Sequence, residues 1–283
     1  MDGGAQLGFD FATPRLVKVT PSRLATWTDC PRRYRMTYLD RPPPPRGGAW
    51  AHHTLGAVVH LALRALFDVP VAERTPRVAA ALVDRHWTSE GFRDAAQAAV
   101  YRGRARDWVA DYTAGLAAGP DPVVAPVGLE QWVTVATERI VAEGRVDRID
   151  RRGAELVIVD YKTGRVVPTV EDTRAAPALA LYAVAAERTL HRPCTQVELH
   201  HLPSGQVLTW QHDRASLREY VRQAEETAGE LAAATTALAA GGDAETLFPP
   251  RPALRCSTCE VRRNCPEGRA AGPERSSWAL LAP

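Results

Sequence analysis

Residues 143–165 read EGRVDRIDRRGAELVIVDYKTGR, and this stretch decides the fold. Its run from Leu156 to Val159 is apolar on both faces, which is typical of a buried central strand. The preceding Arg151-Arg152-Gly153 is a turn signal, so the stretch predicts an antiparallel hairpin. The pairing brings Asp147, on the first strand, close to Asp160 at the end of the second.

Side chains alternate along a strand, so Asp160 and Lys162 are expected on one side and Tyr161 on the other. Two carboxylates and the Tyr161 carbonyl are hard oxygen ligands, which suit Mg²⁺ or Mn²⁺. An ammonium two residues further on can hold an attacking water or a phosphate oxygen. The pattern indicates a metal-dependent nuclease. The alternative is an ordinary edge hairpin in which Asp-Tyr-Lys-Thr-Gly begins a solvated turn.

Lysine is scarce in this chain. Its 35 basic residues include two lysines, Lys18 and Lys162. Arginine is the usual cation here, and a compact, rotatable ammonium does not replace a guanidinium fork. The lysine at position 162 therefore favours the catalytic interpretation.

Length and composition exclude several classes of protein. At 283 residues, 45% hydrophobic and 24% charged, the chain can bury a substantial core. No apolar run approaches the roughly 20 residues that span a bilayer, and no signal-peptide pattern opens the sequence, so we expect a cytoplasmic protein without membrane contact. A net charge of +2 requires any phosphate-binding face to be local. The chain has no G-x-x-x-x-G-K-[ST] motif and so encodes no nucleotide-driven motor.

Five cysteines in a reducing compartment are not expected to form disulfides, so their spacing carries the information. Cys256, Cys259 and Cys265 form a C-x2-C-x5-C motif near the C-terminus. Cys30 stands alone near the other end, and Cys194 has no partner in the sequence. We expect Cys194 to be a small buried residue.

The N-terminal part of the chain is expected to begin with a disordered lead-in over residues 1–19. Ser22 then caps a short helix that turns Leu24 and Trp27 inward. The four prolines of residues 41–46 predict a loop.

An amphipathic helix is predicted over residues 55–67, and His60 flanks its apolar stripe as either a metal ligand or an ordinary boundary histidine. The alanine-rich pattern that follows predicts a helical region over residues 56–120. Its arginines form either a solvated face or a path for DNA. They are Arg102, Arg104 and Arg106.

The remaining pattern alternates strands and helices. Residues 129–136 read as a strand, in which Glu130 is either a third carboxylate for the metal or an exposed edge charge. A helix over 178–190 precedes a pair of strands, and a long helix follows them. The expected elements, with the hairpin, describe an α/β core with a mixed sheet over residues 127–212.

Six landmarks stand in the same order as in one known family. They are residues 22–34, residues 56–60, GRVDRID, VDYKTG, Tyr182 and the terminal cysteine trio. Together they resemble the RecB-like exonuclease branch of the PD-(D/E)xK nuclease superfamily. More narrowly, they resemble its iron-sulfur members, which include the AddB nuclease domain and the nucleases of CRISPR adaptation. The resemblance covers nearly the whole chain after residue 19.

This resemblance implies a restriction-endonuclease-like fold, with a mixed central sheet flanked by helices and a helical insertion, in one nuclease domain over residues 20–283. It implies that Mg²⁺ or Mn²⁺ is held by His60, Asp147, Asp160 and the Tyr161 carbonyl. Lys162 would act in catalysis with the two aspartates. Tyr182 and Arg145 would contact the substrate.

The resemblance also implies a [4Fe-4S] cluster that joins residues 20–40 to residues 250–270. Its four thiolates would come from Cys30, Cys256, Cys259 and Cys265. Four cysteines also suit a zinc ion, which remains the alternative. In either case the site would clamp the two ends of the chain and is structural rather than catalytic.

The implied function is a metal-dependent DNA exonuclease that acts on single-stranded or frayed ends in DNA repair or recombination. One departure concerns Ala178, because relatives often carry a glutamine four residues before the helix tyrosine. This departure motivates an alternative, a non-catalytic DNA-binding subunit beside a helicase or another nuclease. A CRISPR-adaptation nuclease is a further alternative.

Overall fold

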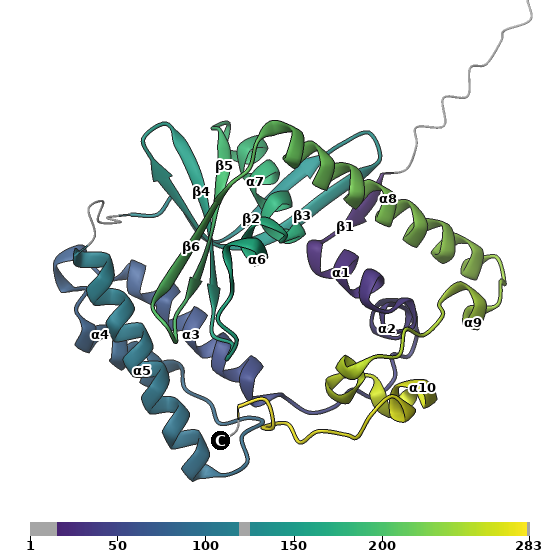
Figure 1. Ribbon diagram of the computed structural model, residues 1–283, viewed down its shortest axis with the longest axis horizontal. Helices are drawn as coiled ribbons and strands as arrows, with labels where there is room; N and C mark the ends of the chain where they lie inside the picture. The colour runs from purple at the N-terminus through teal and green to yellow at the C-terminus, as the bar shows by residue number, and fades with distance from the viewer. Residues whose placement is uncertain (1–15, 119–124, 282–283) are drawn as a thin grey trace, which may run out of the picture.

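A computed structural model describes residues 16–118 and 125–281 of the chain. In this part, six strands form one mixed sheet between two layers of helices (Figure 1). The strands are β1 (Val17–Val19), β2 (Gly128–Ala136), β3 (Ile140–Arg152), β4 (Glu155–Lys162), β5 (Cys194–His201) and β6 (Gln206–Gln211). The predicted fold class, a mixed central sheet flanked by helices, is confirmed.

The predicted hairpin is formed by β3 and β4, which pair antiparallel from Arg148 opposite Val159 to Arg152 opposite Glu155. Gly153 turns the chain with a φ of 60°, a left-handed conformation that glycine adopts without steric cost. Strand β5 runs parallel to β4, and β6 returns antiparallel to β5. The most apolar strand, β4, therefore lies inside the sheet.

Two separate hydrophobic cores explain why β4 is apolar on both faces. Leu156 and Ile158 enter the core beneath α7 (Pro177–Leu190) and α8 (Arg214–Ala239). Val157 and Val159 enter a second core on the opposite face. The helices of that second core are α3 (Ala51–Asp68), α4 (Pro76–His86) and α5 (Ala95–Ala118).

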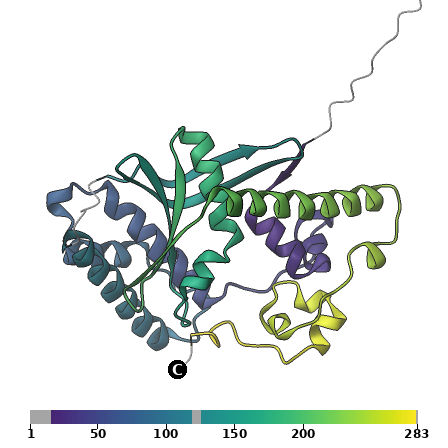
Figure 2. The same cartoon turned by 45° about the horizontal axis from the view of Figure 1, so that its top comes forward.

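Two segments near the ends of the chain, residues 21–39 and 244–270, lie side by side, away from the sheet (Figures 1 and 2). Trp27, Tyr34, Leu231 and Phe248 form a small core between the N-terminal helices and α8. The elements at the two ends are α1 (Pro21–Asp29), α2 (Pro31–Tyr34), a π-helical turn (Arg35–Leu39), α9 (Ala244–Leu247) and α10 (Pro266–Ala270). The other short elements are α6 (Val170–Arg174) and 3-10 turns at Val71–Glu73, Leu254–Thr258 and Arg262–Asn264.

Two sequence predictions need correction. The lead-in was expected to run through residue 19, but residues 17–19 form β1, which pairs parallel to the first residues of β3. The cap of α1 is Thr20, whose hydroxyl accepts a hydrogen bond from the Arg23 amide, and not Ser22. The inward positions of Leu24 and Trp27 are confirmed.

Residues 1–15 of the expected lead-in lie outside the described residues. The predicted helical region over residues 56–120 is divided into α3, α4 and α5 by breaks at residues 69–75 and 87–94, and its last residues, 119 and 120, lie outside the described part. No helix in the described part of the chain is long and apolar enough to cross a membrane.

Candidate metal centre

Asp147 lies where β4 separates from β3. Strand β2 covers one edge of β3 from residue 141 to residue 149. On the other edge, β1 pairs with residues 140–142 and β4 with residues 148–152. Asp147 is thus the first residue of β3 beyond the β4 ladder, and its Oδ2 accepts a hydrogen bond of 3.0 Å from the Tyr161 amide. The carboxylate replaces the backbone acceptor that a continuing ladder would supply.

The strand alternation shifts at this point. Val146 and Ile149 are three residues apart, yet both enter the core beneath α7. In β2, Leu129 pairs with Arg148 and Gln131 with Val146, so Glu130 lies opposite Asp147. The φ of Glu130 is 47°, in the left-handed region that costs a non-glycine residue roughly 1 kcal/mol. A local irregularity in both strands therefore aims two carboxylates at one place, as bulges near active sites often do.

Helix α3 brings His60 to the same place from the other side. Its Nδ1 lies 3.4 Å from Asp147 Oδ1, and its Nε2 lies 3.3 Å from the Tyr161 carbonyl oxygen. Gly56, one turn earlier, allows this approach, because a Cβ there would lie 3.2 Å from Thr163 Oγ1 at the end of β4. The histidine therefore faces the strand ends and keeps part of its side chain exposed.

The ligand atoms of His60, Glu130 and Asp147 lie within 4.8 Å of one another. Among residues 16–118 and 125–281, this is the one group of three or more histidines, cysteines and acids that is so close. Of the predicted ligands, His60, Asp147 and the Tyr161 carbonyl come together, and Glu130 joins them. Asp160 stands beside this trio, where its Oδ2 lies 2.5 Å from Lys162 Nζ.

The electrostatics of the site couple these groups. Burial disfavours the imidazolium form of His60, but the hydrogen bond that His60 donates to Asp147 and the charges of the neighbouring carboxylates outweigh burial and raise the pKa of His60. Burial likewise opposes ionisation of Asp147, but His60 and the Tyr161 amide outweigh it and lower the pKa of this carboxyl. Burial raises the pKa of Asp160, and the charge of Asp147 acts in the same direction. This concentration of acidic groups is an environment that a bound cation relieves.

Tyr182 and Arg145 lie at the border of the trio. A Cβ on Gly144 would overlap the Tyr182 ring, so this glycine of β3 lets α7 approach the sheet. Burial, followed by the charges of Asp160 and Asp147, raises the pKa of Tyr182 to about 12. Arg145 is 59% exposed, and its Nε lies 2.9 Å from Glu130 Oε2. Both residues predicted to contact substrate thus adjoin the acidic site.

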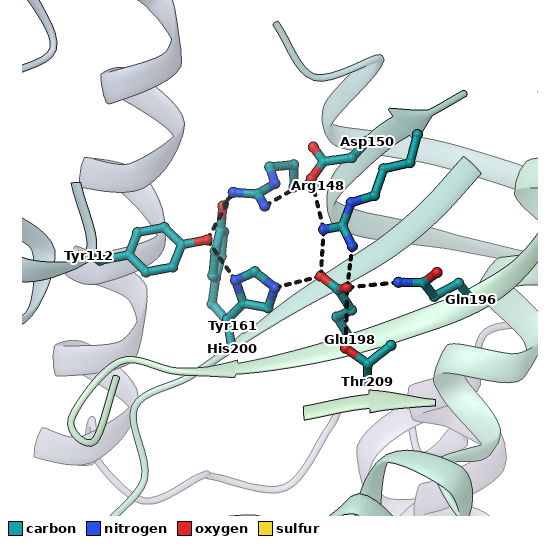
Figure 3. A network of polar contacts seen from close by, with 9 residues as sticks. Tyr112, Arg148, Asp150, Tyr161, Gln196, Glu198, His200 and Thr209 are labelled. Carbon is teal, nitrogen blue, oxygen red and sulfur yellow. Dashed lines mark hydrogen bonds and ion pairs between the residues drawn. The ribbon is translucent and has the colours of Figure 1, made fainter. Parts of the chain in front are cut away.

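A buried polar network anchors Tyr161 from behind (Figure 3). Arg148, 1% exposed, donates hydrogen bonds to the hydroxyls of Tyr112 (2.9 Å) and Tyr161 (3.1 Å) and to Asp150 (2.9 Å). The guanidinium also lies over the Tyr161 ring. The side chain of Tyr161 is therefore fixed by the network, while its peptide contacts Asp147 and His60.

The network continues to β5 through His200. Tyr112 Oη lies 2.7 Å from His200 Nδ1, and His200 Nε2 lies 2.8 Å from Glu198 Oε2. Burial lowers the pKa of His200 and keeps the imidazole neutral, so Nε2 donates to the carboxylate and Nδ1 accepts from Tyr112. Arg152 closes the network with two hydrogen bonds to Glu198, of 2.5 and 2.9 Å. This network was not predicted from the sequence, although two of its members, Arg148 and Asp150, stand in GRVDRID close to Asp147.

The four predicted cluster cysteines, Cys30, Cys256, Cys259 and Cys265, line one cavity between the two ends of the chain. Backbone amides point at three of their sulfurs: Arg251 N–H at Cys30 (3.5 Å), Ala253 N–H at Cys256 (3.5 Å) and Gly268 N–H at Cys265 (3.3 Å). Amide donors of this kind stabilise thiolates. The donor set therefore fits a thiolate-bound metal.

The spacing of these sulfurs bears on which metal fits. Tetrahedral zinc with Zn–S bonds of about 2.3 Å places its sulfurs roughly 3.8 Å apart. Within the described residues, no three of the cysteine sulfurs lie mutually within 4.8 Å. In any three of the four sulfurs, at least one pair therefore lies further apart than in a tetrahedral zinc site. Cys194 is fully buried in the core beneath α7, as expected.

The arginines of α5 engage the protein itself. Arg102 Nε and Arg106 Nε lie 2.7 and 3.6 Å from the Asp84 carboxylate on α4, and Arg104 lies over the Tyr101 ring. Two of the three therefore bridge α4 and α5, which favours the solvated-face interpretation.

Comparisons with known proteins identify the family of this chain. The sequence profile of the PD-(D/E)XK nuclease superfamily matches residues 18–266. A crystal structure of a candidate exonuclease from Eubacterium rectale is similar, with a TM-score of 0.50, 10% identity, and coverage of 92% of this chain and 94% of that one. The structure of SSO0001 has a TM-score of 0.36, 13% identity, and coverage of 90% and 89%. No curated protein matches. The chain belongs to the PD-(D/E)XK nuclease superfamily.

Proposed function

We propose that this nuclease is a Mg²⁺- or Mn²⁺-dependent DNA exonuclease that acts on single-stranded or frayed ends. One observation carries the proposal: the ligand atoms of His60, Glu130 and Asp147 converge beside the Lys162–Asp160 pair. Carboxylate oxygens and one imidazole suit these metals. Ligands about 2.1 Å from an octahedral ion lie roughly 3 Å apart, so a trio within 4.8 Å needs only small side-chain shifts to hold it.

A divalent ion bound there supplies positive charge to the scissile phosphate and acidifies a water molecule. The protein supplies the positioning. Asp160 holds the ammonium of Lys162, whose side chain is 48% exposed and so able to reach a phosphate oxygen or the attacking water. The guanidinium of Arg145 lies at the border of the site, where it can contact the DNA backbone.

The finer assignment is the RecB-like, AddB-type branch, with a [4Fe-4S] cluster on the four cavity cysteines. The common cavity and the amide donors support a metal centre on these thiolates, and the sulfur spacing favours the cluster over zinc. The cavity lies between α2 and the segment before α10. The cluster would therefore stabilise the contact between these two segments and take no part in hydrolysis.

The alternative is a non-catalytic DNA-binding subunit of a helicase–nuclease complex. Ala178 favours this alternative, because it lies on α7 one turn before Tyr182 and lacks the side-chain amide that a glutamine would place near the acidic site. The alternative retains the fold and DNA binding but predicts no metal-dependent cleavage.

Hydrolysis of end-labelled single-stranded DNA, with Mn²⁺ and then with chelator, separates the two. The proposal predicts that Lys162→Ala loses at least about 100-fold in cleavage rate, the usual scale for a group that stabilises transition-state charge, while DNA affinity is retained. Lys18→Ala is the matched control, because Lys18 is the chain's other lysine and is exposed on β1. Metal-dependent cleavage that survives in Lys162→Ala refutes the catalytic role of this lysine.

A further inference from the structure

Trp132 is exposed beside the metal centre. Its exposed fraction is 60%, whereas the chain's other six tryptophans are buried or half-buried. An exposed indole offers a ligand or partner a large, rigid apolar face with a polar N–H at its edge. The position of this side chain on β2 indicates which ligand.

The register of the sheet joins Trp132 to the catalytic acids. Trp132 pairs directly with Arg145 on β3, so the two side chains stand on one face, with Cβ atoms about 5 Å apart. The Nε of Arg145 in turn binds Glu130, a member of the metal trio. The pair therefore adjoins the metal trio, within reach of a nucleic-acid strand bound there.

The face that carries the pair is open. Val133 and Val135, the neighbours of Trp132 along β2, enter the core beneath α7, so the indole stands on the opposite face. The core of α3 to α5 covers parts of β4 on that face but includes no residue of β2. Among the described residues, Glu130 is the one ion-pair partner of Arg145, and the 59% exposure of the arginine side chain leaves the guanidinium accessible to a phosphate.

We propose that Trp132 and Arg145 form a stacking ledge, in which the indole stacks on a nucleobase of single-stranded DNA and the guanidinium contacts the adjacent phosphate. The inference rests on the proposed function and adds the element that grips the strand. Base–aromatic stacking is tolerant of sequence and needs an unpaired base, which accords with single-stranded or frayed ends.

The test compares the DNA affinities of the wild type and of single variants in the presence of a chelator, which prevents metal-dependent cleavage during the measurement. Fluorescence anisotropy measures the Kd of a 12-nucleotide oligothymidylate and of a 12-nucleotide abasic analogue. The wild type should bind the oligothymidylate about tenfold more tightly. In Trp132→Ala this preference should fall to about twofold or less, while affinity for the abasic strand is unchanged. Trp132→Phe should keep most of the preference, and Thr134→Ala, on the same face two residues along, should keep all of it.

An unchanged preference in Trp132→Ala, or equal binding of both strands by the wild type, overturns the ledge. An unchanged preference combined with a new oligomeric state in light scattering would show that the indole serves a protein contact instead. If the wild type binds neither strand, the proposed DNA substrate itself fails. A lost preference with unchanged abasic binding, in a variant whose urea midpoint equals that of the wild type, supports the ledge.

Discussion

Replacing Arg148 with methionine should cost a large part of the stability of the protein. The substitution removes three hydrogen bonds and leaves Asp150, 2% exposed, without its close cation, because the nearest Arg152 nitrogen is 4.0 Å away. Breaking a buried ion pair at one partner typically costs about 3–5 kcal/mol. The total stability of such a protein is about 5–15 kcal/mol. With a denaturant slope near 3 kcal/mol/M, the urea midpoint should fall by about 1–1.7 M.

The assay is equilibrium urea unfolding followed by tryptophan fluorescence. A second variant, Arg148→Met with Asp150→Leu, removes the stranded charge as well as the cation and should recover more than half of the loss. Arg139→Met replaces an exposed arginine on the loop before β3 and should change the midpoint little. A loss below about 1 kcal/mol for Arg148→Met, or a double variant no more stable than the single one, would refute the argument that this arginine neutralises a buried carboxylate.

Three further predictions concern the groups around the site. His200 and Arg152 outweigh burial and lower the pKa of Glu198 to about 2, so the ionised Glu198 stabilises the fold fully above about pH 4.5 and loses this effect as the pH falls towards 2. The difference in unfolding free energy between the wild type and Glu198→Gln, measured by urea unfolding, should therefore shrink over that range and not grow. Tyr161→Phe removes the hydroxyl that binds Arg148 and should weaken Mn²⁺ binding several-fold, measured by calorimetry, with little change in fold. An unchanged Kd for Mn²⁺ would show that the network does not position the Tyr161 peptide beside Asp147. Cys256→Ser should lower the iron and sulfide content of anaerobically purified protein while Cys194→Ser leaves it unchanged, and equal content in both would exclude the cluster.

The parts of the fold that sequence could predict are those with local patterns. The β3–β4 hairpin followed from an apolar run and a turn signal, and the approach of Asp147 to the end of β4 followed from their pairing. Strand β1 was missed because three residues beside a glycine-rich segment carry no periodicity. The meeting of His60 with the Tyr161 carbonyl, 101 residues apart, depends on helix packing, which periodicity does not report. The resemblance to a known family supplied that contact.

Strict alternation would have misplaced the residues nearest the metal. With a period of two, Asp147 and Arg148 point to opposite faces, yet Asp147 contacts His60 of α3 and Arg148 lies over Phe67 of the same helix. This shift in the alternation of β3 is accompanied by a left-handed residue on β2, Glu130, which lies opposite Asp147. Because the residue is not a glycine, the sequence gives no sign of its left-handed conformation. One irregular position thus lets a single strand supply both a carboxylate to the metal trio and the cation that anchors Tyr161. The strain at Glu130 is therefore best explained as the cost of placing adjacent residues on the same side of the sheet.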